Sequence, residues 1–171
     1  MPIMLSWSRK ESLAGKVSDF SMTFWKGCEI PDDLYFDVDQ DVWIRLEQDG
    51  QVTIGMTDPA QARCGKIVHM HFKKVGKRLE QGKSVVTVES AKWAGPVPTP
   101  VSGTVTANNE DAFREDILIA NRDPYGAGWM ARIQPENWKQ ESAVLLKGEA
   151  ALESYKARIE EMGITCFRCA D

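Results

Sequence analysis

The feature that most constrains the fold of this chain is a series of short runs of β-branched and aromatic residues, closely spaced and broken by Gly, Pro, Asp and Asn. The runs "LYFDV", "VWIRLEQ" and "QVTIGM" follow one another from Leu34, and Asp49-Gly50 before the third run is a hairpin signal. "KIVHMHF", "SVVTVES", "SGTVTA", "DILIANR" and "GWMARIQ" continue the pattern. Many short strands at such spacing are typical of an all-β barrel or sandwich.

Two helical segments are expected beside these strands. In "TDPAQARCG", Asp58 can cap a short helix, Pro59 suits its first position and Gly65 ends it. After Pro135, the segment "ENWKQESAVLLKGEAALESYKARIEEMG" carries apolar residues at helical spacing and stops at Gly163.

The chain therefore divides into a β domain with an addition at each end. Residues 1–29 contain aromatic residues but no clear period, so we expect an extension packed on the core. The β domain spans residues 30–138, and residues 139–171 form a C-terminal helix and a cysteine-bearing tail. A chain of 171 residues is long enough for one domain with a sizeable core.

Charge and hydropathy argue against several classes of partner. A net charge of −4 with no basic stripe disfavours nucleic acid. No apolar run approaches the roughly 20 residues that span a bilayer, so no membrane partner is expected. The start "MPIMLSWSRKES" places its charges after a very short apolar stretch, which is unlike a signal peptide. These features predict a cytoplasmic protein whose four cysteines are reduced.

One lysine, Lys92, lies where the chain reverses between "SVVTVES" and "TPVSGTVT". Most turn lysines are solvated and inert, which leaves open an unmodified β domain that serves only in interactions. Here "GPVPTP" follows the lysine, and because each proline fixes one backbone dihedral, we expect a stiff turn that holds the side chain clear of the body. A deprotonated lysine amine can be acylated by an activated acid, and the product is a swinging arm.

The surroundings of Lys92 resemble the lipoyl-lysine hairpin of the glycine cleavage H protein family. "ESAK" ends at Lys92 and "PVSG" ends at Gly103, which is the spacing of the family's two motifs. "VWIRLEQDGQVTIGMTDPAQARCGKIV" and "DPYGAGWMARIQP" resemble its other signatures, in collinear order over about residues 33–138. The resemblance implies a mainly β fold, a flattened barrel-sandwich hybrid (lipoyl domain) with a short internal helix and a helical C-terminal segment. It also implies a non-enzymatic carrier with lipoic acid in amide linkage to Lys92.

Trp93 separates this chain from two related groups. Biotin carriers share the architecture but usually flank the lysine with methionines, which Ala91 and Trp93 do not match. In an ordinary H protein the residue after the lysine is usually small. A tryptophan there can pack back onto the barrel, or it can serve as a docking anchor, since Trp is favoured at binding hot spots.

Other departures are similar to the lipoate-binding proteins of the heterodisulfide-reductase-like sulfur oxidation pathway, notably "GCEIPDDLYFDVDQDVWIR" and "ESAKWAGPV". That resemblance implies sulfur intermediates on the arm. The partners would be a lipoate ligase or lipoyl transferase, a heterodisulfide-reductase-like complex and a dihydrolipoamide dehydrogenase-type enzyme. The alternative is an H protein that carries the aminomethyl group between glycine decarboxylase and aminomethyltransferase.

Five further side chains are candidates for chemistry. Glu89 can help an enzyme recognise the turn through its charge, or it can be a solvated carboxylate. Cys166 and Cys169 form a Cys-x-x-Cys pair that can exchange with a dithiolane, act as a thiol enzyme or be two spare thiols, but one such pair cannot complete a tetrahedral zinc site. His69 and His71 alternate on one strand face without an evident third ligand, so we interpret them as surface residues.

Overall fold

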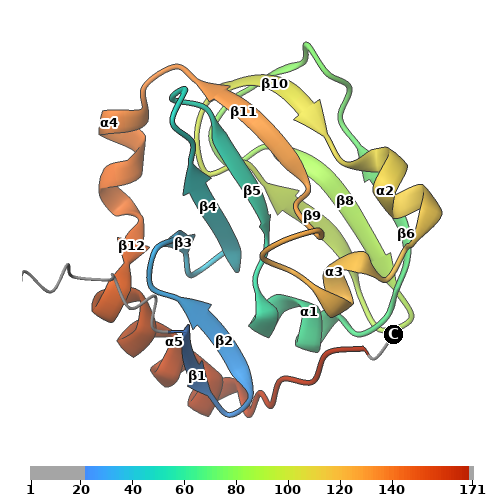
Figure 1. Cartoon of the computed structure of the whole chain (residues 1–171), viewed down its shortest axis with the longest axis vertical. Coiled ribbons are helices and arrows are strands. Elements are labelled where there is room, and N and C mark those ends of the chain that lie inside the picture. Colours follow the sequence, from blue (N-terminus) through green and yellow to red (C-terminus); the bar gives the residue numbers. More distant parts are fainter. Residues whose placement is uncertain (1–21, 170–171) are drawn as a thin grey trace, which may run out of the picture.

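The structure is a computed structural model that describes residues 22–169 of the chain. Residues 1–21 and 170–171 lie outside the described part, and with them lies most of the expected N-terminal extension, residues 1–29. Figure 1 shows the strands gathered at the centre, with helices around them. Within the described residues, no helix is both long and apolar enough to cross a membrane.

The larger sheet has seven strands, and neighbouring strands in it are antiparallel. In spatial order they are β12 (Leu146–Lys147), β3 (Tyr35–Asp37), β4 (Val42–Leu46), β5 (Val52–Met56), β11 (Ala131–Pro135), β10 (Gly103–Asn108) and β7 (Arg78–Leu79). β4 and β5 form the hairpin that Asp49-Gly50 predicts.

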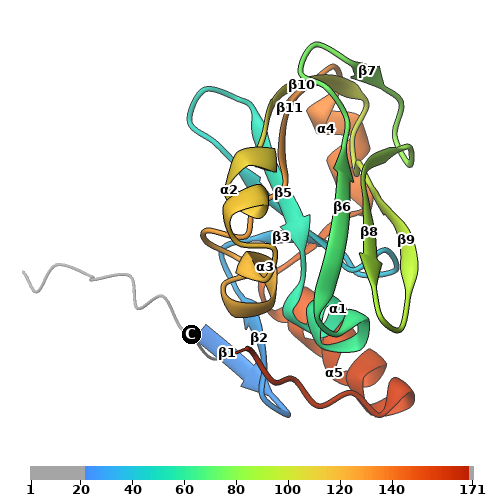
Figure 2. The same ribbon diagram turned by 90° about the vertical axis from the view of Figure 1, so that its right-hand side faces the viewer.

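The second sheet has three antiparallel strands, β6 (Ile67–Phe72), β8 (Ser84–Ser90) and β9 (Ala94–Pro98), with β8 in the middle. Figure 2 shows it as a separate layer beside the larger sheet, and the two layers enclose one apolar core. Ile54 enters this core from the larger sheet and Val86 from the smaller, and the burial of such side chains holds the layers together. The predicted mainly β barrel-sandwich hybrid is confirmed, as packed sheets and not as a closed barrel.

The predicted internal helix is α1 (Asp58–Cys64), but its N-cap differs from the prediction. Thr57 has extended backbone dihedrals, and its Oγ1 accepts a hydrogen bond from the Ala60 amide at 3.3 Å. Asp58 is therefore the first helical residue and not the cap, and its carboxylate is buried under the C-terminal tail. Gly65 ends the helix at φ 74°, a left-handed value that favours glycine.

The segment "DILIANR", which the pattern predicts as a strand, is not one. It follows α2 (Glu110–Glu115) and runs into a second short helix, α3 (Ile119–Arg122). The Asp116 carboxylate accepts a hydrogen bond from the Leu118 amide at 3.1 Å, which closes a turn where a strand would need an extended backbone. The isoleucines of this segment pack on the core from that turn. Local polar bonds here override the strand propensity.

The predicted C-terminal helix is broken into pieces. They are α4 (Trp138–Glu141), the 3₁₀ turn η1 (Ser142–Val144), strand β12, and α5 (Gly148–Met162). β12 pairs with β3, and Gly148 has φ 59°, so the chain turns before α5 begins. The predicted stop at Gly163 is confirmed.

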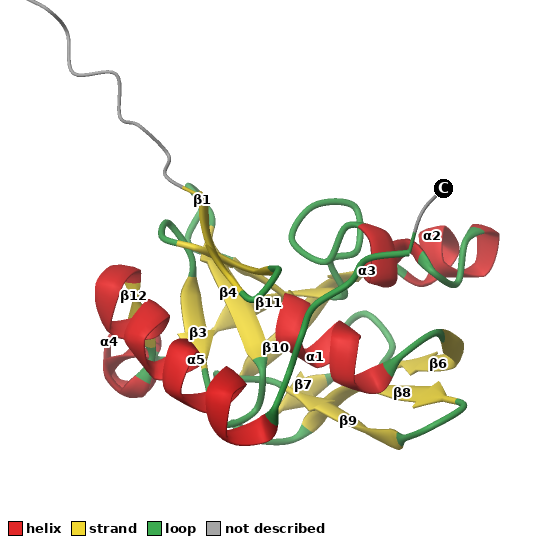
Figure 3. Ribbon diagram, turned by 90° about the horizontal axis from the view of Figure 1, so that it is seen from below, coloured by secondary structure: helices red, strands yellow, loops and turns green. Residues whose placement is uncertain are grey.

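A hairpin that the sequence pattern does not predict begins the described chain. Its strands are β1 (Met22–Trp25) and β2 (Cys28–Pro31). It packs with α5 and the tail, residues 164–169, around a second apolar cluster that includes Phe36 and Tyr155. Figure 3 shows the tail crossing α1 on its way to α3. Both ends of the described chain are thereby joined to the β domain.

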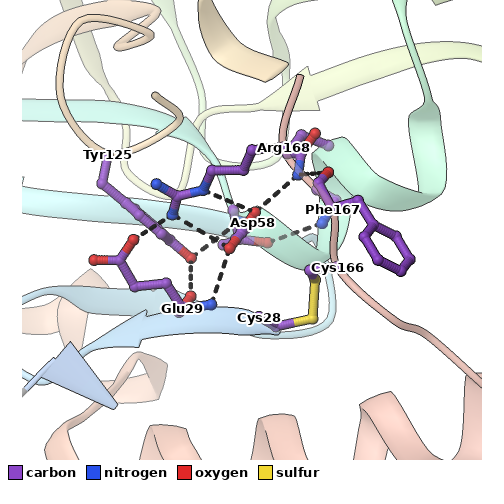
Figure 4. The surroundings of a disulfide bond; sticks show 10 residues. Cys28, Glu29, Asp58, Tyr125, Cys166, Phe167 and Arg168 are labelled. Carbon is purple, nitrogen blue, oxygen red and sulfur yellow. Dashed lines mark hydrogen bonds and ion pairs between the residues drawn. A yellow bond between two sulfur atoms is a disulfide. The ribbon is translucent and has the colours of Figure 1, made fainter. Parts of the chain in front are cut away.

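The tail is held by a disulfide and by ion pairs to two buried carboxylates (Figure 4). Cys28 and Cys166 are bonded, with their Cα atoms 4.8 Å apart and a sequence separation of 138. Arg168 forms ion pairs with Glu29 and with Asp58, whose side chains are buried. Because two carboxylates share one guanidinium, charges that would be costly to bury alone are compensated.

Candidate functional site

The hairpin of β8 and β9 carries Lys92 at its tip. Glu89 lies opposite Ala94 as the last pair of the ladder, so residues 91–93 form the tip. The prolines after Lys92 do not stiffen this turn, because Pro96 and Pro98 are part of β9 itself. β9 is an edge strand of its sheet, and an edge is where a proline without an N–H is tolerated. The proline-rich stretch is thus the second strand of the hairpin and not the turn.

The tip is held by hydrogen bonds to Ser90. The Ser90 amide donates to the Trp93 carbonyl at 2.7 Å, and the Ser90 Oγ accepts from the amides of Lys92 and Trp93 at 3.1 and 3.0 Å. The same hydroxyl donates to the Cys64 carbonyl, at the end of α1, at 2.6 Å. The tip is therefore tied to the body of the domain.

The sequence predicts that the Lys92 side chain projects clear of the body, but it lies instead beside the end of α1. The lysine stem runs beside Gly65: a Cβ atom built there would lie in ordinary van der Waals contact with it, 3.6 Å from the Lys92 Cδ and 3.9 Å from its Nζ. The residue as a whole is still exposed. Within residues 22–169 the amine makes no ion pair, which leaves it accessible to an acylating enzyme.

A cavity of about 450 Å³ opens beside the tip. Its lining includes Lys92 and Trp93 from the hairpin, Cys64 from α1, and Met56 and Val97 from the two sheets. Burial raises the pKa of the Cys64 thiol, so this sulfur stays protonated near neutral pH and is not a nucleophile there. The cavity combines apolar walls with a charged rim.

Asp41 organises that rim. It lies in the turn between β3 and β4 at φ 56°, is buried, and accepts bonds from Arg63 at 2.7 Å and Arg158 at 3.1 Å. The hydrogen bond to Asp41 raises the pKa of Arg158, so this α5 residue stays charged. The ion pairs connect α1 and α5 across the cavity. The sequence pattern gives no sign of this cluster, because its three members are far apart in the chain.

Glu89 and Trp93, the two predicted recognition residues, lie on either side of Lys92. The Glu89 carboxylate is 44% exposed, and its Oε1 is 3.7 Å from the Nε2 of His71. Trp93 is also 44% exposed, although its ring covers Gly95 on β9 and leaves no room for a Cβ there. Trp93 thus packs back on the hairpin and still presents an apolar surface at the tip.

The predicted thiol pair is not formed, because Cys166 is bonded to Cys28. The expectation of four reduced cysteines is corrected likewise, since only Cys64 and Cys169 are free thiols. A disulfide within the Cys-x-x-Cys pair would need a turn between Cys166 and Cys169. The tail is extended there instead, and the Cys169 amide donates to the Asn121 carbonyl at 3.1 Å. A Cys28–Cys166 bond spans 138 residues, so spacing alone could not reveal it.

His69 and His71 are exposed on β6, with ring centroids 4.3 Å apart. No three His, Cys, Asp or Glu side chains of the described chain are arranged to hold a metal ion.

Comparisons with known proteins agree with this geometry. The model of the family described as Glycine cleavage H-protein matches residues 34–158. "Glycine cleavage system H protein 2" of Aquifex aeolicus is 43% identical over 154 residues, which cover 90% of this chain and 92% of that protein. "Probable glycine cleavage system H protein 2" of Sulfolobus acidocaldarius is 43% identical over 143 residues, or 82% of this chain and 95% of that one.

A solved structure has the same fold. The crystal structure of a glycine cleavage system H protein from Mycobacterium marinum superposes with a TM-score of 0.63 at 30% sequence identity. The match covers 79% of this chain and all of that one.

Proposed function

The chain belongs to the glycine cleavage H-protein family, whose members are non-enzymatic carriers of lysine-bound lipoic acid, and we propose that Lys92 is the lysine that carries it. The observation that supports this assignment is the tip itself: an exposed amine without an ion pair within the described chain, at the end of a hairpin that carries the family's motif. The bound group supplies a dithiol that takes up and releases what is carried.

The residues around Lys92 fit such a group. The dithiolane end of lipoic acid is apolar, and the cavity beside the tip offers Met56, Trp93 and Val97 as apolar walls. The lysine stem runs along the surface at Gly65, at the end of α1. In this proposal the chain performs no bond chemistry of its own. It holds the attachment point, offers the arm a sheltered surface between visits to partner enzymes, and presents Glu89 and Trp93 for recognition.

For the carried group, we propose the aminomethyl intermediate of glycine cleavage. The relatives named above are H proteins of that system, and the similarity extends over nine tenths of this chain in the first of them. The partners are then a lipoate ligase or lipoyl transferase, glycine decarboxylase, aminomethyltransferase and dihydrolipoamide dehydrogenase. The cytoplasmic location expected from the N-terminal residues stays a prediction.

Sulfur transfer to a heterodisulfide-reductase-like complex is the second candidate. None of the relatives described above is named for sulfur oxidation. The observation in its favour is Trp93, an exposed ring beside the arm, because a bulky side chain in a small docking surface adds contact with one partner and clashes with another. The dihydrolipoyl thiols are also chemically suited to attack sulfur.

Lipoylation with a lipoate ligase, lipoate and ATP tests the attachment site. Peptide mass spectrometry is expected to find the lipoyl group on Lys92 alone. Lys92→Arg should abolish it and keep the charge and the fold, because guanidinium is not acylated by this chemistry. Lys66→Arg is the matched control, since Lys66 is exposed and follows Gly65 directly, and this variant should be modified normally. A folded wild-type protein left unmodified at Lys92 refutes the assignment.

The lipoylated protein then distinguishes the two pathways. Exchange of bicarbonate with the glycine carboxyl group, in the presence of the glycine decarboxylase component, is expected at a rate similar to that of an H protein of known activity. Exchange more than a hundredfold slower, with lipoylation complete, would reject the aminomethyl assignment in favour of the sulfur candidate.

A further inference from the structure

We propose that Ser90 is a positioning residue for the acylation of Lys92, and that its hydroxyl keeps the tip in the one conformation that a modifying enzyme recognises. The proposal rests on Lys92 being the lipoyl attachment site. It assigns to Ser90 a role that the sequence motif by itself does not explain, because Ser90 is not among the residues that line the cavity.

The first observation is the number of groups that the Ser90 Oγ joins. It accepts hydrogen bonds from two consecutive amides of the tip, those of Lys92 and Trp93, at 3.1 and 3.0 Å. Neither amide takes part in the strand ladder, which ends at the pair of Glu89 and Ala94. A serine side chain that binds the amides two and three residues ahead closes a local turn. The backbone at Lys92 is therefore fixed by this side chain.

The second observation is the bond from Ser90 to α1. Its hydroxyl donates to the Cys64 carbonyl at 2.6 Å, and this carbonyl belongs to the last turn of the helix, where carbonyls lack partners within the helix. On the next residue, the Gly65 carbonyl accepts from the Asn121 side chain at 2.9 Å. Two polar side chains from other elements thus complete the end of α1, and one of them is Ser90, the last residue of β8 before the tip.

The third observation connects this bond to the lysine. Gly65, the residue after Cys64, is the one beside which the Lys92 stem runs, because a Cβ built on it would lie in van der Waals contact with the stem, 3.6 Å from Cδ. The Ser90–Cys64 bond therefore sets how far the tip lies from the surface over which the stem runs. One hydroxyl fixes both the backbone from which Lys92 projects and the surface that guides its side chain.

Loss of the hydroxyl should leave the hairpin ladder intact and the tip with several conformations. An enzyme that recognises one of them then binds more weakly, in proportion to the fraction of molecules that present it, while the reaction of the bound lysine is unchanged. If one tip in about ten stays competent, KM for the protein substrate rises about tenfold and kcat stays within twofold.

The variants are Ser90→Ala, Ser90→Thr as the conservative rescue, and Ser84→Ala as the matched control. Ser84 begins the same strand, is half-buried like Ser90, and donates its own hydroxyl to the Val86 carbonyl at 3.0 Å, far from the tip. Lipoylation kinetics should show the tenfold rise in KM for Ser90→Ala, recovery to within threefold for Ser90→Thr, and no change for Ser84→Ala.

Amide hydrogen exchange measured by NMR provides a readout that needs no lipoylation. The amides of Lys92 and Trp93 are expected to exchange at least fivefold faster in Ser90→Ala than in the wild type, with the amide of Val88, inside the ladder, unchanged. This comparison separates loss of tip order from general destabilisation.

Three results would overturn the proposal: a KM for Ser90→Ala within twofold of the wild type, an equal rise in KM for Ser84→Ala, or unchanged exchange at the tip amides. Absence of lipoylation at Lys92 in the wild type is a different failure, because it refutes the attachment site itself.

Discussion

Reduction of the disulfide between Cys28 and Cys166 is expected to lower the free energy of unfolding by about 3–5 kcal/mol. The bond closes a loop over a sequence separation of 138 residues, which is most of the described chain. The chain-entropy relation gives about 5 kcal/mol for a loop of this length, and measured disulfides commonly deliver about 2–4 kcal/mol. The expected loss of about 3–5 kcal/mol runs from the middle of the measured values to the chain-entropy value.

The tail should stay in place after reduction. Arg168 keeps its ion pairs with Glu29 and Asp58, and the Gln61 side chain still donates to the Phe167 carbonyl at 3.0 Å. The effect of reduction is therefore expected chiefly in the unfolded state, which gains conformational freedom, and much less in the folded state. The native circular dichroism spectrum should be unchanged.

Urea unfolding with and without a phosphine reductant measures the difference. With a slope of about 2 kcal/mol/M, the midpoint should fall by roughly 1.5–2.5 M urea. The double variant Cys28→Ala with Cys166→Ala should resemble the reduced wild type and should not respond to the reductant. Cys169→Ala is the matched control, because this free, half-exposed thiol should leave the midpoint nearly unchanged.

Two results would contradict the reasoning. One is an unfolding midpoint that does not move on reduction. The other is the alkylation of all four cysteines in unfolded, unreduced protein, which would mean that the disulfide is absent and that the sequence-based expectation of reduced thiols holds.

Two further predictions concern charge and pH. Glu89→Gln should slow lipoylation or a partner reaction about three- to tenfold at low ionic strength and leave the melting temperature unchanged. Glu115→Gln, which removes an exposed carboxylate on α2, is the control. Equal rates for the wild type and Glu89→Gln would mean that Glu89 is only a solvated carboxylate. Burial raises the pKa of Tyr125 and of Tyr155 well above 10, so the unfolded chain loses protons that the fold retains, and stability present below pH 10 should be lost as the pH rises beyond it. Absorbance at 295 nm should then show two of the three tyrosines ionising only together with the loss of circular dichroism, and ionisation of all three in folded protein would contradict this.

The sequence by itself determined the parts of this protein that depend on near neighbours. The β-branched and aromatic runs on either side of Asp49-Gly50 predict the hairpin of β4 and β5, because Asp-Gly is a turn signal between two such runs. Gly65 predicts the end of α1 for a similarly local reason. The motif that ends at Lys92 predicts the site that the hairpin tip presents. Each signal lies within a few residues of the element that it specifies.

Only the tertiary structure decided which distant groups meet. Cys166 bonds Cys28 instead of Cys169 because the extended tail passes the β1–β2 hairpin at Cys166 and carries Cys169 on to α3. The Ser90 hydroxyl reaches the Cys64 carbonyl because the hairpin packs on the end of α1. Neither contact leaves a trace in local spacing, since each depends on how the layers close around their shared core. The position of the candidate lysine is thus readable from the chain, whereas the bonds that hold it in place exist only once the chain has folded.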